Sequence, residues 1–252
     1  MDSQVVIQLK EVNKSFYAQR TQHLTIRDSL INVFARKKGS QLIKAVQNVS
    51  FDVVSGEVFG IIGSNGSGKS TLINLIMGSM RPDRGSLIRT KGRIMRLALG
   101  MGIDPNLSAR DNVYINGSIL GLSFRQIGEK FEEILNFAGL TEFVDVPVKN
   151  FSSGMRQRLT FSIAMHANAD IFLLDEFFGG VGDIDFKKKS NEAFRQTIID
   201  GKTIIMVSHS MSIIKKYCTR VMWIDKGVPK LVDKPEIVIP MYKESFENAG
   251  AS

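Results

Sequence analysis

The chain has 252 residues, a formal net charge of +8 and a hydrophobic content of 43%. This length can bury one substantial α/β core, and no apolar run approaches the roughly 18 residues of a membrane-spanning helix. The opening Met1-Asp2-Ser3-Gln4 lacks the pattern of a secretory signal, so we expect a protein made and kept in the cytosol. Its basic balance predicts an acidic partner, either nucleic acid or an anionic membrane surface.

The first predicted element is a strand at Val5–Leu9, and an unusual connection follows it. Residues 17–44 are long for a link between strands and are basic around Arg36-Lys37-Lys38. We interpret this stretch as an insertion and hypothesise that its basic residues meet an anionic membrane surface.

The next segment combines a buried strand at 56–62, a glycine-rich loop and a helix from Lys69 to Met80. The loop and the start of the helix have the spacing of a P-loop. The motif consists of Gly63, Ser64, Asn65, Gly66, Ser67, Gly68, Lys69, Ser70 and Thr71. In such a loop, glycines let backbone N–H groups surround phosphates, the lysine reaches the terminal phosphates, and the first hydroxyl holds Mg²⁺. The sequence therefore predicts a site for ATP and Mg²⁺.

Beyond the P-loop helix, the turn cluster 81–85 is followed by two short strand-like runs, at 85–88 and 94–97. From about Ala109 to Ala169 the apolar residues recur with helical spacing, which predicts a separate helical region. Uninterrupted apolar runs at 170–174, 203–207 and 220–224 are typical of a parallel sheet covered on both faces. The final residues are expected to form a short tail with one helix.

Polar residues follow two of these buried strands. Asp175 and Glu176 end the first strand, and His209 follows the second. The carboxyl ends of parallel strands meet at one sheet edge, so we expect all three beside the P-loop. We assign Asp175 to Mg²⁺ through water, Glu176 to orienting or deprotonating the attacking water, and His209 to the γ-phosphate. The single cysteine, Cys218, is interpreted as a small buried residue.

One more motif completes the set. Ser152-Ser153-Gly154-Met155 opens a predicted helix, and a helix N-terminus offers free N–H groups to phosphate. This motif resembles the signature motif of ABC-type ATPases. Together with the P-loop, Asp175-Glu176 and His209, it extends the resemblance to that family over nearly the whole chain. The resemblance implies an α/β P-loop ABC-type nucleotide-binding domain, with a mostly parallel sheet core, an antiparallel β subdomain and a helical subdomain. It implies core boundaries at 1–88 and 170–228, a helical subdomain at 89–169 and a tail at 229–252.

The family resemblance also implies that a second copy of the chain contributes residues to the ATP site. In that family the signature loop, here Ser152 to Met155, binds the ATP of the other subunit, so we expect a homodimer. Asp183 is expected to act across the dimer, although an extra residue places it one position later than usual. Either Phe16 or Tyr17 is expected to stack on adenine, with Phe16 favoured by spacing. No glutamine lies between Arg89 and Arg125, where the family places a Mg²⁺-contacting one.

The surroundings of the signature, Val146 to Arg156, resemble the ATP-binding subunits of bacterial polysaccharide exporters for O antigen, capsule or teichoic acid. This implies a peripheral protein on the cytoplasmic face of the inner membrane, bound to an integral-membrane permease dimer that handles a lipid-linked polysaccharide. We expect no appended carbohydrate-binding domain before Ser252 and therefore sugar recognition elsewhere. Alternatives are an exporter ATPase for another cargo and a nucleic-acid-handling ABC ATPase. The single P-loop and the lack of a coiled coil argue against nucleic acid as a partner.

Overall fold

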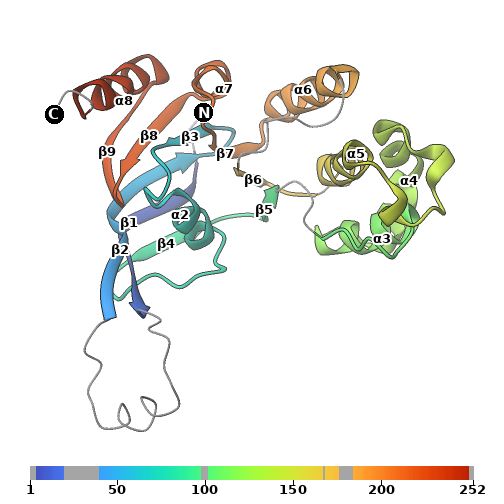
Figure 1. Cartoon of the computed structure of the whole chain (residues 1–252), viewed down its shortest axis with the longest axis horizontal. Coiled ribbons are helices and arrows are strands. Elements are labelled where there is room, and N and C mark those ends of the chain that lie inside the picture. Colours follow the sequence, from blue (N-terminus) through green and yellow to red (C-terminus); the bar gives the residue numbers. More distant parts are fainter. Residues whose placement is uncertain (1–3, 20–39, 98–101, 167, 176–183, 250–252) are drawn as a thin grey trace, which may run out of the picture.

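The structure is a computed structural model that describes residues 4–19, 40–97, 102–166, 168–175 and 184–249. It contains two sheets and a group of helices that stands beside the larger sheet (Figure 1). Within the described residues, no helix is long and apolar enough to cross a membrane.

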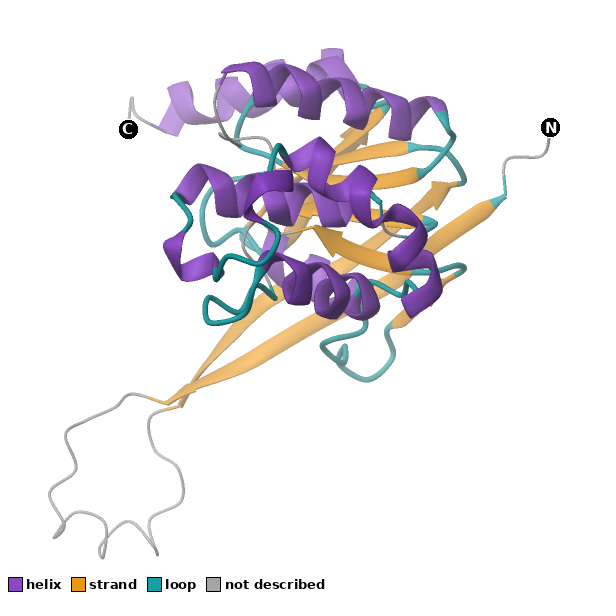
Figure 2. Ribbon diagram, turned by 90° about the vertical axis from the view of Figure 1, so that its right-hand side faces the viewer, coloured by secondary structure: helices purple, strands orange, loops and turns teal. Residues whose placement is uncertain are grey.

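The smaller sheet has three antiparallel strands in the order β2-β1-β4. β1 (Val5–Gln19) and β2 (Ser40–Val54) are each 15 residues long, and β4 (Leu87–Thr90) pairs with the first part of β1. The strand expected at Val5–Leu9 thus continues through Gln19, so strand pairing extends into both ends of the predicted insertion. The two long strands form a hairpin that projects away from the rest of the molecule (Figure 2).

The larger sheet has six strands in the order β5-β6-β7-β3-β8-β9. Its first five strands run parallel and the last is antiparallel to its neighbour. This agrees with the expected mostly parallel α/β core. The strands are β3 (Val58–Ile62), β5 (Ile94–Leu97), β6 (Ile171–Asp175), β7 (Thr203–Val207), β8 (Arg220–Asp225) and β9 (Val228–Asp233).

Both faces of this sheet are buried, which explains its continuous apolar runs. Successive side chains of a strand point to opposite faces, so in β3 Phe59 and Ile61 face the small sheet and α2 (Lys69–Ile76). Val58 and Ile62 face the opposite layer. That layer contains α6 (Ile184–Ile199), α7 (Met211–Tyr217) and α8 (Pro235–Ala249), which lie together along one side of the sheet (Figure 1).

The helical region has a core of its own. It consists of α3 (Ala109–Ile119), α4 (Phe124–Ala138) and α5 (Ser153–Met165), with short 3₁₀ turns at Thr141–Phe143 and Val148–Asn150. Buried aliphatic residues such as Val113, Ile127, Ile134 and Leu159 join the three helices.

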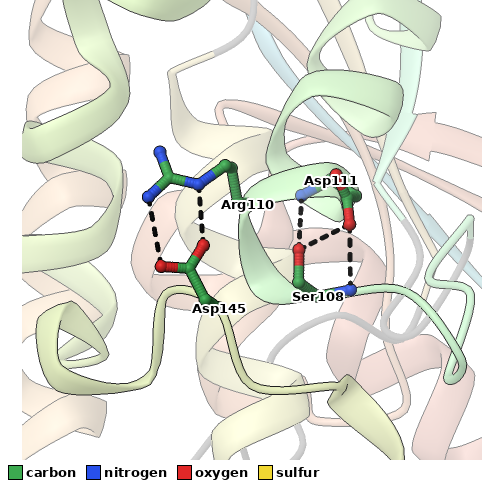
Figure 3. A network of polar contacts seen from close by, with 4 residues as sticks. All are labelled: Ser108, Arg110, Asp111 and Asp145. Carbon is green, nitrogen blue, oxygen red and sulfur yellow. Dashed lines mark hydrogen bonds and ion pairs between the residues drawn. The ribbon is translucent and has the colours of Figure 1, made fainter.

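Polar contacts fix the start of α3 (Figure 3). Ser108 and Asp111 form a capping box, in which each side chain accepts a hydrogen bond from the other residue's backbone N–H. Arg110 pairs with Asp145 through its Nε, 2.8 Å from Oδ1. The Arg110–Asp145 pair ties the first turn of α3 to the loop that leads toward α5.

Three boundaries differ from the sequence predictions. The P-loop helix ends at Ile76 instead of Met80, because Gly78 adopts a φ of 77° that ends helical geometry. β5 belongs to the large sheet, although residues 89–169 were assigned to the helical region. The expected tail of one helix also contributes β9, an edge strand in which Pro229 is tolerated.

Candidate phosphate and nucleotide site

The glycine-rich loop joins the end of β3 to the first residue of α2, as its motif predicts. Gly68 caps the helix with a φ of 104°, a conformation that favours glycine. A Cβ at Gly68 would collide with the carbonyl oxygen of Ala45, and one at Gly63 would collide with that of Ile224. Two of the loop's glycines are therefore required by the close approach of neighbouring backbone.

Lys69 is buried and turns its ammonium group back toward the loop. Its Nζ donates hydrogen bonds to the carbonyl oxygens of Gly63 and Ser64, each at 2.8 Å. Its side chain is thus held at the loop that it follows, in a position from which it can reach a phosphate bound there.

A second loop supports the glycine-rich loop from outside the motif. The turn between β8 and β9 contains Lys226 and Gly227, with φ values of 47° and 82°. The N–H of Gly227 donates to the carbonyl oxygen of Ser67 at 2.9 Å, and its own carbonyl accepts from Gln47 at 2.8 Å. The turn therefore joins the loop to β2.

A pocket of about 390 Å³ lies over the loop. It is lined by Ile43, Lys44, Ala45, Asn65, Gly66, Gly68, Lys69, Ser70, Thr71 and Lys226. Three lysines give it a positive charge that suits an anion such as a nucleotide phosphate. The sequence motif predicted Lys69 alone, since Lys44 and Lys226 come from distant parts of the chain.

The donor set fits a Mg²⁺–triphosphate. The Ser67 Oγ is buried and has no hydrogen-bond partner among the described residues, so the loop has a polar atom to offer a ligand. A cation at this site would need oxygen ligands, which Ser70 at the start of α2 and Asp175 at the end of β6 could supply.

The large sheet brings Asp175 and His209 to the edge from which the P-loop emerges. Asp175 is paired with Val207 in the parallel register of β6 and β7, and His209 follows two residues later. β7 also pairs with β3, which leads into the loop. His209 is exposed at this edge.

Asp175 carries an ion pair that the motif did not predict. The Nη2 atom of Arg96 in β5 lies 2.6 Å from Asp175 Oδ2, and its Nη1 lies 3.0 Å from Asn74 Oδ1 in α2. The sequence feature that could have revealed this ion pair is the single arginine in the otherwise apolar run Ile94–Leu97. A charged residue in a largely buried strand requires a partner.

The hairpin places the two aromatic candidates on opposite faces. Phe16 pairs with Ile43 across β1 and β2, and Tyr17 pairs with Leu42. Directly paired side chains share a face of an antiparallel sheet, so Phe16 lies on the face of Ile43, which lines the pocket. Tyr17 lies on the opposite face, which it shares with Lys44 of the pocket lining, and 75% of its surface is exposed.

The signature residues lie at the start of α5, in the helical region. Ser152 caps this helix by accepting a hydrogen bond from the Met155 N–H at 3.2 Å, and Ser152 and Ser153 are exposed. Gly154 and Met155 are half-buried. Among the described residues, the lining of the P-loop pocket contains none of these four, so they present a separate surface of the chain. Glu176 and Asp183 lie outside the described residues.

Comparison with known proteins gives consistent results. The model of the family described as "ABC transporter" matches residues 46–179. The O-antigen export system ATP-binding protein RfbB of Klebsiella pneumoniae is 38% identical over 85% of this chain and 89% of its own length. RfbB of Myxococcus xanthus is 39% identical over 99% of this chain. The teichoic acids export ATP-binding protein TagH of Lactococcus lactis is 41% identical over 79% of this chain.

Some relatives are considerably longer than the aligned region. This chain spans 58% of the Myxococcus protein and 42% of the Lactococcus protein. Among solved structures, the dimeric ATP-binding cassette MJ0796 bound to ADP and Pi has a TM-score of 0.69. It is 22% identical, and the match covers 91% of this chain and 98% of that one. This likeness establishes a shared fold.

Proposed function

The chain belongs to the ABC transporter family, and on that premise we propose that it is the ATPase subunit of an exporter of a lipid-linked polysaccharide, with O antigen as the first candidate. The observation that carries the proposal is the similarity to O-antigen export ATP-binding proteins over most of both chains. The P-loop beside Asp175 and His209 supplies a site at which ATP hydrolysis can take place.

We propose the following division of labour in that site. The loop from Gly63 to Thr71 binds the phosphates, and Lys69 neutralises the terminal ones. Ser70 and, through water, Asp175 hold Mg²⁺, which neutralises charge on the β- and γ-phosphates when it is bound. Phosphoryl transfer depends chiefly on positioning and charge neutralisation, so few residues are needed.

The attacking water requires a separate group. Glu176 follows Asp175 directly and is proposed to orient or deprotonate that water. His209, at the same edge of the sheet, is proposed to contact the γ-phosphate. Phe16 is proposed to stack on the adenine, supported by its shared face with Ile43.

A second copy of the chain completes the proposed site. The N-terminus of α5, where exposed Ser152 and Ser153 are followed by half-buried Gly154 and Met155, would meet the phosphates bound by the partner copy. Asp183 is proposed to act at the same contact. The arrangement requires a homodimer whose closure traps ATP between the two copies.

We propose that the dimer works on the cytoplasmic face of the inner membrane against a permease dimer, which carries the polysaccharide. The net charge of +8 supports contact with an anionic membrane surface. We retain residues 1–88 and 170–228 as the proposed core, 89–169 as the helical subdomain and 229–252 as the tail. Within this division, β5 and β9 contribute strands to the sheet of the core.

A second cargo is supported by a specific observation. TagH of Lactococcus lactis, named for teichoic acid export, is 41% identical over 79% of this chain. Because the permease handles the polymer, the same ATPase chemistry would serve O antigen, teichoic acid or, as a third candidate, capsule. The sugar composition of the accumulated polymer distinguishes these three cargoes.

The test replaces the chromosomal copy with Glu176→Gln and analyses lipid-linked glycans from inner-membrane extracts. We expect turnover of ATP to fall by roughly 10²–10⁴, the usual scale for a positioned acid–base group, while ATP still binds. A lipid-linked polymer should accumulate on the cytoplasmic side, and its sugar composition identifies the cargo. Glu192→Gln in α6 is the matched control. Unchanged glycans in a variant that binds but does not hydrolyse ATP would refute polysaccharide export.

A further inference from the structure

Arg96 is a charged residue in a mostly buried part of the large sheet. Its neighbours in β5, Met95 and Leu97, are 6% and 4% exposed. The Arg96 side chain is 23% exposed, and its guanidinium group is held from two directions by residues of different elements. An arginine held in this way has a defined position, since both ends of its planar fork are engaged.

The two partners of Arg96 belong to the two elements of the proposed metal site. Asp175 ends β6, and its carboxylate, 15% exposed, receives Arg96 Nη2 at 2.6 Å. Asn74 receives Nη1 at 3.0 Å and lies four residues after Ser70 in α2. Residues four apart lie on the same face of a helix. The guanidinium group therefore lies between the strand that carries Asp175 and the helix that carries Ser70.

This position has an electrostatic consequence for a metal ion. In the structure, the guanidinium group of Arg96 neutralises the negative charge of Asp175 at hydrogen-bonding distance. A divalent cation that approaches the same carboxylate also approaches the guanidinium group, and like charges repel more strongly in a partly buried site than in water.

We propose that Arg96 competes with Mg²⁺ for Asp175 and thereby sets the magnesium affinity of the site. The inference rests on the proposed function, which makes Asp175 a metal-binding residue. Arg96 acts through Asp175 and touches no reacting atom in this scheme. Magnesium then binds productively when a nucleotide supplies further oxygen ligands and outweighs the ion pair.

The test measures magnesium affinity without measuring catalysis. The purified full chain is saturated with ADP, MgCl₂ is titrated, and the unfolding temperature reports the half-saturating concentration. For Arg96→Gln, which keeps a polar group but removes the charge, we expect that concentration to fall about tenfold. A tenfold change corresponds to about 1.4 kcal/mol, a modest repulsion for two cations that share one partly buried carboxylate.

Two control variants separate charge competition from a structural role. Arg96→Lys keeps the charge but loses the planar fork, so its half-saturating concentration should lie closer to that of wild type than to that of Arg96→Gln. Arg89→Gln removes an equivalent charge from β4, in the other sheet, where Arg89 is exposed, and should leave the half-saturating concentration unchanged. Without nucleotide, Arg96→Gln should unfold at a lower temperature than wild type, because Asp175 loses its partner.

The outcomes are distinct. A half-saturating concentration that is unchanged or higher in Arg96→Gln would overturn the competition. Should that variant fail to fold, Asn74→Ala, which removes the second anchor of Arg96, is expected to lower the concentration by a smaller factor, and no decrease would overturn the proposal. A wild-type chain that ADP does not stabilise, with or without Mg²⁺, would instead refute the proposed nucleotide site itself.

Discussion

Lys69 Nζ lies 2.8 Å from the carbonyl oxygen of Gly63, so the ammonium group of Lys69 is hydrogen-bonded to the backbone of the P-loop. A lysine held in this way lies at the loop where phosphate is proposed to bind.

Lys69→Ala should lower ATP hydrolysis by roughly 10²-fold or more, the scale found when one preorganised donor to developing charge is removed. It should also abolish most of the increase in unfolding temperature caused by MgATP. Lys226→Ala removes an exposed lysine from the rim of the same pocket and should have a much smaller effect. Hydrolysis rates and thermal unfolding of the two variants test this, and equal losses would contradict a special role for Lys69.

The register of the hairpin predicts different behaviour for two adjacent aromatics. Phe16→Ala should raise the Kd of ATP roughly tenfold, within the range that stacking of a base on an aromatic ring contributes. Tyr17→Ala should leave the Kd within about twofold, since Tyr17 lies on the other face of the hairpin. Calorimetric titration with ATP distinguishes them. A larger loss from Tyr17→Ala would show that the other face meets the base.

The ion pair of Arg110 and Asp145 predicts a dependence of stability on pH. The hydrogen bond from Arg110 lowers the pKa of the Asp145 carboxyl below its usual value. A lowered folded-state pKa stabilises the fold above the unfolded pKa of about 3.9, and this contribution is lost as the pH falls through the folded value.

Asp145→Asn should therefore lower the unfolding temperature at pH 7, by no more than about 2 °C for so exposed a pair. The difference from wild type should shrink below about pH 4 and in high salt. Glu142→Gln, an exposed carboxylate in the neighbouring 3₁₀ turn, is the matched control. A difference that persists unchanged in acid would exclude the charge as its cause.

Cys218 is predicted to be inert in the folded protein. Its side chain is 8% exposed in the core, and burial raises the pKa of the thiol to about 12. The thiolate is the reactive form, so alkylation by iodoacetamide at pH 8 should be negligible until denaturant unfolds the chain. Mass spectrometry of native and denatured samples measures this, and rapid labelling of native protein would contradict the burial.

Much of the fold was predictable because its signals are local. The P-loop between a buried strand and a helix, the apolar strands that form β6, β7 and β8, and the helical region each depend on residues close together in sequence. Their spacing and continuous hydrophobicity specify backbone geometry and burial directly. The fate of Cys218 was equally predictable, since a lone cysteine in an apolar setting is usually buried.

Tertiary structure decided which distant residues share the site. Arg96 meets Asp175 because β5 lies beside β6 in the sheet, although 79 positions separate them in sequence. The face of Phe16 follows from its register with β2, where a bulge intervenes and a shift of one residue would reverse it. Gly227 donates a hydrogen bond to Ser67 of the P-loop because the turn between β8 and β9 brings it there. The sequence by itself thus determined the local chemistry of the phosphate loop and its family. Strand order and register, which depend on long-range packing, decided the charges and the aromatic face around it.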